Sequence, residues 1–415
     1  MKIVVEQAAI DPDRAVFDVA ERKGIGHPDS LADLVADAFS HRYIRWCQEN
    51  IGTIPNHWVD KVNLVGAASE VTFGGFEILK PVDCYLFGKV TEQVAGAEVP
   101  VYDLFADAVS AVLPTALGDK RVLEHLRLHV NNSSGVAVDH DPQFYRPATL
   151  AGLTHVLERE SVANDTVICV SASRPGLAGA LAMRLESSVT GEEFRAAFPS
   201  IGTDVKVMVV RTSSELDITA CVPFHPEVTD SFTDYVNALA EVKEAMTVLV
   251  QNLLADDERG LQITTWGLHL NTKDVPGHGY LAPFGTSLGK GDCGAVGRGN
   301  RFSGVIEPLR PSSCEAPSGK NPLHHAGKIY SSLTADAAAE IMRRTGVFAE
   351  VTVAARNGAP LDDPAYVLVS LDRRANADTA SVVEDCVRTT MATAGQFAQR
   401  FLHTDLISRF REGGQ

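Results

Sequence analysis

GTSLGKGDCGAVGRGNRFSGVIEPLRPSSCEAPSGKNPLHHAGKIY, residues 285–330, is the most informative stretch of the chain. It is dense in glycine, much of it lacks helical or strand periodicity, and it is rich in arginine and lysine, although the chain's formal net charge is −16. Glycines let backbone N–H groups approach a ligand closely, and arginine and lysine bind phosphate. The alternative is a surface loop with solvated charges, but irregular loops this long are uncommon unless they are functional. The stretch therefore predicts a site for a multiply charged phosphate, with Asp292, Arg298, Arg301, Lys320 and Lys328 as candidate residues.

Length and composition are those of an ordinary globular protein. The 415 residues suggest two or three domains, and 45% of them are hydrophobic and 22% charged. No run of about eighteen apolar residues predicts a membrane span. The N-terminus shows no secretory signal, so we expect a cytoplasmic protein. The acidic balance argues against nucleic acid as a partner, and the seven scattered cysteines argue against a disulfide framework or a zinc site.

A second glycine-containing loop precedes a predicted helix. Residues 24–30 read GIGHPDS, and apolar residues follow at helical spacing. Pro28 suits the first turn of that helix, and a loop that enters a helix N-terminus can bind phosphate through free N–H groups. Asp29 could bring Mg²⁺ to the same phosphates, and His27 could donate a hydrogen bond to a leaving oxygen. A simple helix cap, with Asp29 favourable to the helix dipole, explains the same residues equally well.

Two further pairs of charged residues accompany predicted strands. Asp60 and Lys61 lie in NHWVDK, where an exposed ion pair is the better interpretation from these residues alone. Asp204 and Lys206 lie in TDVKVMVV, residues 203–210, which we predict to be a buried strand. Their spacing places both side chains on one face, so they must be satisfied by each other or by a ligand. Helices and strands alternate along the chain, which indicates the α+β class with antiparallel sheets covered by helices.

Several segments of the sequence resemble the archaeal-type S-adenosylmethionine synthetases, also called methionine adenosyltransferases. They are, in order, ERKGIGHPDSLAD, HWVDK with LVG after it, ANDT, TDVKVM, GDCGAVGRGNR and RPSSCEAPSGKNPLHHAGKIY. The resemblance implies an α+β fold with three similar sheet-plus-helix domains around a pseudo-threefold axis. We assign these to residues 1–140, with the GIGHPD loop, 141–265, with the TDVKVM strand, and 266–415, with the phosphate loops. The resemblance also implies a homodimer with active sites between its subunits.

The resembled family makes S-adenosylmethionine from ATP and methionine. The methionine sulfur displaces the triphosphate from the ribose, and the triphosphate is then hydrolysed to pyrophosphate and phosphate, so charge on the leaving group must be stabilised. The resemblance implies Mg²⁺ as a cofactor, with K⁺ as a second candidate. Position by position, it implies catalytic roles for His27, Lys206 and Arg298, metal binding by Asp29 and Asp292, and ATP binding by Asp60, Lys61, Asp204, Asp292, Arg301, Lys320 and Lys328.

The departures from the family pattern gather near the expected amino-acid and nucleoside sites. VGAASE stands where the family has VGGQAT, so Ala68 takes the position of the Gln that holds the methionine amino group, and Glu70 is the nearby substitute. NNSSGVA and VICVSASRPG replace two further family strings, whereas the phosphate-handling strings are kept. A specialised paralogue is therefore an alternative: an ATP-dependent adenosyl transferase with another nucleophile, a triphosphate-cleaving enzyme, or a non-catalytic nucleotide-binding protein. The sequence names neither the nucleophile nor every nucleotide that the site accepts.

Overall fold

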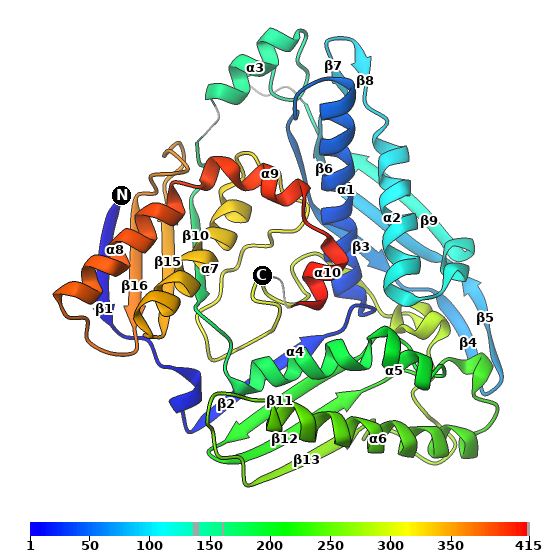
Figure 1. The fold of residues 1–415 in the computed structure, drawn as a ribbon. Helices are drawn as coiled ribbons and strands as arrows, with labels where there is room; N and C mark the ends of the chain where they lie inside the picture. The colour runs from blue at the N-terminus through cyan, green and yellow to red at the C-terminus, as the bar shows by residue number, and fades with distance from the viewer. Residues whose placement is uncertain (136–140, 160–161, 413–415) are drawn as a thin grey trace.

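The computed structural model describes residues 1–135, 141–159 and 162–412, and it confirms the expected α+β class. Three four-stranded sheets form the framework. Figure 1 shows them as the sides of a triangle whose centre holds the C-terminal helix α10 (Leu406–Arg411). Helices cover one face of each sheet, and a large group of buried apolar side chains lies beneath each one. No helix among the described residues is both long enough and apolar enough to cross a membrane.

The first sheet contains the strand that leads into the GIGHPD loop. The buried Val207 and Val209 alternate with less buried residues, as expected for a strand with one covered face. Neighbouring strands are antiparallel, except at one edge of the sheet, where Thr265–Leu270 runs parallel to Glu215–Cys221. The strands, in spatial order, are β13 (Thr265–Leu270), β12 (Glu215–Cys221), β11 (Lys206–Thr212) and β2 (Phe17–Lys23), and the helices on this side are α4 (Leu177–Val189), α5 (Glu192–Ala197) and α6 (Phe232–Ala255).

The strand expected over residues 203–210 begins later than predicted, at Lys206. The backbone just before it is bonded to loops instead: the carbonyls of residues 203 and 205 accept from the N–H groups of Gly26 and Gly24, at 3.1 and 2.6 Å. The Asp204 N–H donates to the Gly285 carbonyl at 3.2 Å. Asp204 therefore precedes the strand, and the prediction that Asp204 and Lys206 share one strand face is wrong.

The second sheet receives the helix that begins at the GIGHPD loop. Pro28 lies in the first turn of that helix, as predicted, where its missing N–H costs no hydrogen bond. The apolar residues of the helix face the sheet and contribute to its core. The strands, in spatial order, are β14 (Gly294–Ala295), β3 (His57–Val65), β6 (Val82–Val90) and β9 (Leu126–Asn132), the covering helices are α1 (Pro28–Asn50) and α2 (Val101–Leu117), and two hairpins are made by β4 (Ala68–Thr72) with β5 (Gly75–Lys80) and by β7 (Gln93–Val94) with β8 (Ala97–Glu98).

The third sheet contains the first and last strands of the described chain. The amphipathic pattern of residues 381–400 predicts one long helix there, but the structure has two helices divided by a 3-10 turn that contains Gly395, a residue of low helix propensity. The strands, in spatial order, are β1 (Lys2–Gln7), β16 (Tyr366–Leu371), β15 (Ala349–Ala355) and β10 (Val167–Ala172), and the helices on this side are α7 (Ala326–Thr345), α8 (Ala377–Met391) and α9 (Phe397–Leu402), with α3 (Leu150–Arg159) apart from the sheets.

Each sheet combines strands from more than one of the ranges 1–140, 141–265 and 266–415. The third sheet pairs β1 with β16, the second pairs β14 with β3, and the first pairs β2 with β11. The division of the chain into these three ranges therefore stays a prediction. If the three ranges are domains, each of them contributes strands to the sheet of another.

A buried arginine joins the first sheet to the centre of the triangle. Arg22 of β2 and Glu186 of α4 are each 1% exposed, and Arg22 Nε lies 3.0 Å from Glu186 Oε2. Arg22 Nη2 donates to the Phe410 carbonyl of α10 at 2.6 Å, and Nη1 donates to the Gly304 carbonyl. Burial raises the pKa of Glu186, and the charge of Arg22 opposes that rise. One side chain thus holds three segments that are far apart in sequence.

A second carboxylate, the partly buried Glu307, makes the stability of the fold depend on pH. Its Oε1 accepts a hydrogen bond from the Gly176 N–H at 3.3 Å. Burial raises the pKa of Glu307 from 4.5 to about 7, with a further contribution from the charge of Asp18. Between these two pH values the unfolded chain releases a proton that the folded protein retains, so the stability falls as the pH rises through this window and is constant above it.

Glu307→Gln is expected to stabilise the protein at alkaline pH, because glutamine mimics the protonated carboxyl. The expected gain is about 3 kcal/mol at about pH 8, and it should nearly vanish at about pH 4, where wild-type Glu307 is largely protonated in both states. Urea denaturation at the two pH values measures the difference. The same gain at both values would show that ionisation of Glu307 is not its cause.

Candidate active site

The loop before α1 places His27 and Asp29 at the start of that helix. His27 is the N-cap residue, and its Nδ1 accepts a hydrogen bond from the Asp29 N–H at 3.2 Å. A Cβ at Gly24 would lie 2.5 Å from the Val205 carbonyl oxygen, so only glycine permits this close approach of the loop to the backbone before β11. The loop is therefore held in place by the first sheet while it starts the main helix of the second.

Protonation of His27 follows from its surroundings. Burial lowers the pKa of His27, opposed mainly by the charge of Asp204, so the ring is neutral at neutral pH. In a neutral ring whose Nδ1 accepts a hydrogen bond, the proton is on Nε2. His27 is thus arranged to donate one hydrogen bond from Nε2 to an incoming ligand.

Asp204 and Asp292 meet at one serine hydroxyl. The Ser287 N–H donates to Asp204 Oδ2 at 2.8 Å, and its hydroxyl lies between Asp204 Oδ2 and Asp292 Oδ2, 3.2 Å from the latter. Burial raises the pKa of Asp204, opposed mainly by His27. The structure therefore brings together His27, Asp29, Asp204 and Asp292, from segments more than 250 residues apart.

Two lysines face each other across β2 and β11. Lys23 and Lys206 are direct cross-strand partners, an arrangement that is unfavourable for like charges. Each has its own carboxylate: Lys23 Nζ lies 2.9 Å from Asp29 Oδ2, and Lys206 Nζ lies 2.9 Å from Glu21 Oε2. The Lys206 side chain is 42% exposed. The candidate site thus contains two neighbouring cations, Lys23 and Lys206, which we call the cationic strip, and each of them is paired with a carboxylate.

Asp60, Lys61 and Lys320 form a second group on β3 and the GKNP segment. Asp60 Oδ1 lies 2.7 Å from Lys61 Nζ, and Asp60 Oδ2 lies 3.8 Å from Lys320 Nζ. Lys320 is buried and also pairs with Glu315, whereas Lys61 is exposed. Of these cations, Lys61 alone is freely accessible to a ligand in the described structure.

The remaining basic candidates divide between the surface and the interior. Arg298 is exposed, and no hydrogen bond or ion pair of its guanidinium is found among the described residues. Arg301 donates to the Gly297 carbonyl at 3.3 Å. Lys328 is buried, with its Nζ 2.6 Å from Asp37 Oδ1 and 4.2 Å from the centroid of the Phe401 ring. Lys328 therefore lies in the interior, whereas Arg298 lies at the surface.

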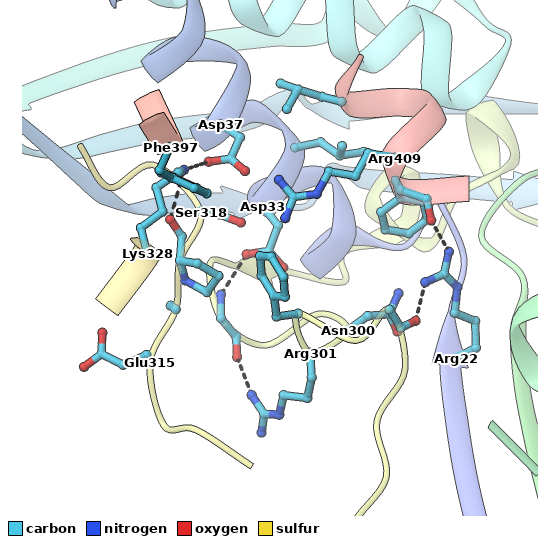
Figure 2. Close-up of a pocket in the computed structure, with 18 residues that line it drawn as sticks. Arg22, Asp33, Asp37, Asn300, Arg301, Glu315, Ser318, Lys328, Phe397 and Arg409 are labelled. Carbon is cyan, nitrogen blue, oxygen red and sulfur yellow. Dashed lines mark hydrogen bonds and ion pairs between the residues drawn. The ribbon is translucent and has the colours of Figure 1, made fainter. Parts of the chain in front are cut away.

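A central cavity of about 110 Å³ lies behind the GRGNR loop. Figure 2 shows Lys328 directed toward Asp37, and Arg409 extending from the C-terminal helix into the cavity. Burial raises the pKa of Asp33 to about 7, although the Gly297 N–H bonds to it at 2.9 Å. Acidic and basic side chains line the cavity, and Asp33 and Asp37 of α1 hold the GRGNR and GKNP segments through the Gly297 N–H, the Gly319 N–H and Lys328.

The comparisons with known proteins agree with this geometry. A model of the S-adenosylmethionine synthetase (AdoMet synthetase) family matches residues 1–405. The chain belongs to this family. The S-adenosylmethionine synthase of Aeropyrum pernix is 31% identical over 402 residues, or 94% of each chain, and that of Pyrococcus furiosus is 32% identical over 369 residues, or 87% of each chain. The resemblance inferred from the sequence is thereby confirmed.

The fold of the S-adenosylmethionine synthetase family is supported independently by a solved structure. It is described as an unusual S-adenosylmethionine synthetase from Campylobacter jejuni, and it matches with a TM-score of 0.55 at 14% identity. The match covers 96% of this chain and 100% of that one. At this identity the likeness speaks for the fold alone.

Divalent metal ions are expected at a site of this family. The carboxylates of the candidate site fit that expectation if the nucleotide supplies some of the metal ligands. No cluster of three or more His, Cys, Asp or Glu residues within the described ranges could hold a metal ion by itself. Mg²⁺ commonly binds one or two carboxylates together with phosphate oxygens. Asp29 and Asp292, near the cationic strip, suit such a shared site, in which the nucleotide supplies the other ligands.

Lys23, Ser287 and Lys290 are site residues that the sequence reasoning missed. Lys290 donates to the Leu281 carbonyl at 3.0 Å and lies 4.6 Å from the centroid of the Tyr280 ring. Burial lowers the pKa of Lys290, and the charge of Asp204 opposes this. Lys23 lies inside ERKGIGHPDS, so its place ahead of the glycine loop was the available signal. No pattern in the sequence pointed to the hydroxyl of Ser287.

Proposed function

We propose that the protein transfers the adenosyl group of ATP to the sulfur of methionine and hydrolyses the displaced triphosphate to pyrophosphate and phosphate. The main support is one observation: His27 caps the N-terminus of α1 close to Lys23, which faces Lys206 across the two strands, and burial lowers the pKa of His27. In the reaction the C5′–S bond forms, the C5′–O bond breaks, and its electron pair leaves with the triphosphate. The site must therefore stabilise negative charge that grows on one oxygen.

The chain supplies this stabilisation through donors and cations. His27 donates from Nε2 to the oxygen that leaves C5′, and the start of α1 adds the positive end of the helix dipole. Lys206 and Arg298 bind the outer phosphate oxygens. The further proposed contacts to ATP are Asp60, Lys61, Asp204, Arg301 and Lys320. Lys328, which is paired with Asp37, holds the phosphate-binding segments from behind.

Asp29 and Asp292 are the proposed ligands of Mg²⁺, which when bound neutralises charge on the phosphate oxygens. K⁺ is proposed as a second ion, without an assigned position. Ser287 keeps Asp292 beside Asp204, so the metal-binding carboxylate stays close to His27.

Incubation with ATP, Mg²⁺ and K⁺, with and without methionine, followed by mass spectrometry, tests the proposed function. We expect S-adenosylmethionine only when methionine is present. Phosphate release without any adenosylated product would identify a triphosphate-cleaving enzyme, and binding of ATP without turnover would identify a nucleotide-binding protein.

The replacement at Ala68 predicts how methionine is recognised. Ser69 is already engaged, because its Oγ donates to the Gly289 carbonyl at 2.8 Å, whereas Glu70 is exposed on β4. An unpaired polar group costs about 1–3 kcal/mol. Glu70→Ala is therefore expected to raise the KM for methionine, and Ala68→Gln to leave it unchanged or lower it by up to about tenfold. Steady-state kinetics measure both, and an ordinary KM that is insensitive to Glu70→Ala would place the recognition group elsewhere.

We propose that the protein is a homodimer that covers the open faces of its sheets. On β6, Tyr85 stacks on His129 at 4.3 Å between ring centroids and on Phe87 at 5.6 Å, on the face opposite the helices. Ile168 and Tyr366 are exposed on the third sheet. Apolar patches of this kind commonly mark interfaces.

Phe87→Lys is expected to weaken the dimer, because it places a charge in the proposed interface. Sedimentation should show a dimer for wild type and for Val248→Lys on the exposed side of α6, and a larger monomer fraction for Phe87→Lys. A wild-type monomer with full activity would refute the dimer.

A further inference from the structure

Lys23 is held at the centre of the candidate site by the GRGNR segment. The Asn300 side chain clamps its backbone: the Lys23 N–H donates to Asn300 Oδ1 at 2.9 Å, and Asn300 Nδ2 donates to the Lys23 carbonyl at 2.8 Å. The Lys23 ammonium then lies 2.9 Å from Asp29 Oδ2 and 2.6 Å from the Arg298 carbonyl. Its side chain is 13% exposed. Both the strand and the phosphate loop therefore fix where this ammonium lies.

The same ammonium occupies the carboxylate oxygen that a metal ion would need. Asp29 Oδ1 accepts from the Ala295 N–H at 3.0 Å, so Oδ2, the oxygen bound to Lys23, is the one available for exchange. A divalent cation and an ammonium repel each other strongly at such short distances. The Lys23 ammonium therefore opposes the binding of a metal ion at Asp29 Oδ2 as long as it stays in this position.

The register of the sheet shows which ligand Lys23 would meet after it moves. Lys23 lies directly opposite Lys206 on β11, which lies opposite Cys221 on β12, so the three residues form one row. If Lys23 leaves Asp29, its ammonium loses its carboxylate partner beside Lys206, and an anion would be needed there because like charges on facing strands repel. The triphosphate of a nucleotide, which brings the metal ion with it, supplies that negative charge.

We propose that Lys23 is an exchangeable counter-ion and a further phosphate-binding residue. In the nucleotide-free protein it neutralises Asp29. When the metal–nucleotide complex binds, Asp29 would be the residue that holds the metal ion, and the Lys23 ammonium would turn from Asp29 to the triphosphate. This inference rests on the proposed function for the identity of the ligand, but it concerns binding only and needs no methionine.

The exchange predicts opposite effects of one substitution on two affinities. In Lys23→Met, Asp29 loses its counter-ion, so nucleotide-free protein should bind Mn²⁺, used as the probe metal, about tenfold more tightly. Inorganic tripolyphosphate with Mg²⁺ should bind about tenfold more weakly, because one phosphate contact is lost. Electron paramagnetic resonance measures the first affinity and calorimetry the second.

Four further variants make the test specific. Lys23→Arg keeps the charge and should retain wild-type Mn²⁺ affinity. Lys23→Gln also removes the charge and should show the two shifts expected of Lys23→Met, so it can replace that variant if Lys23→Met folds poorly. The double variant Lys23→Met/Asp29→Asn should lose the gain in Mn²⁺ affinity. Lys243→Met, on the exposed side of α6, should change neither affinity.

The contrary outcomes are distinct. If Lys23→Met and Lys23→Gln lower both affinities, or leave that for Mn²⁺ unchanged, Lys23 is a fixed structural partner of Asp29 and the exchange is wrong. If Lys23→Met shows both opposite shifts in affinity while the wild-type protein forms no adenosylated methionine, the proposed reaction is wrong and the exchange stands.

Discussion

Lys206→Met is expected to lower kcat by about a hundredfold or more while leaving the melting temperature close to that of wild type. Lys206 lies on the open side of β11, and its proposed partner is the charge that develops on the leaving triphosphate. Loss of one such electrostatic contact costs on the order of 3 kcal/mol in the transition state. In the free protein Lys206 has only a half-exposed pair with Glu21, and exposed pairs contribute little to stability.

Steady-state kinetics and thermal unfolding of the same preparation check this expectation. Lys206→Arg is the matched control, because it keeps the charge and should recover part of the rate. A Lys206→Met enzyme with the wild-type rate and wild-type stability would remove Lys206 from the catalytic residues, and an equal loss of rate and stability would assign it a structural role.

Arg22→Met is expected to have the largest effect on stability. It leaves Glu186 as a buried charge without its partner and frees two carbonyls, those of Gly304 and Phe410. Breaking a buried ion pair on one side costs about 3–5 kcal/mol. Because the lost contacts include the C-terminal helix, α10 should become more accessible to proteases before the rest of the chain unfolds.

Urea denaturation and limited proteolysis measure the two consequences. The control is Arg343→Met, which removes an exposed pair with Glu340 on α7 and should leave the midpoint unchanged. Arg22→Met with the stability of wild type would show that the buried pair does not join the first sheet to the centre of the molecule.

The sequence predicted the local elements of the fold better than their long-range arrangement. The helix after the GIGHPD loop follows from apolar periodicity and from Pro28, which are local signals. Asp204 was wrongly placed within a strand, because its backbone bonds to the Gly285 carbonyl of a distant loop, which no local pattern reveals. The pairing of β1 with β16 likewise depends on contacts across the whole chain.

The candidate site shows the same division. Its anion-binding chemistry could be predicted from glycine, arginine and lysine, but the partner of each charge could not. Lys328 was grouped with the phosphate contacts, yet the structure pairs it with Asp37 in the interior. Lys23 was overlooked, because its importance comes from its contact with Asp29 and from the clamp by Asn300, which is far away in sequence. Residue types indicate what a site can bind, and packing decides which of them face the ligand.

Phosphorus-31 NMR of ATP turnover in the presence of Mg²⁺ and methionine tests most directly the claim that the triphosphate leaves as one group. We predict that pyrophosphate and phosphate accumulate in equal amounts, that neither ADP nor AMP forms, and that turnover stops when methionine is omitted. Formation of ADP or AMP, or the same phosphate release without methionine, would contradict adenosyl transfer at this site.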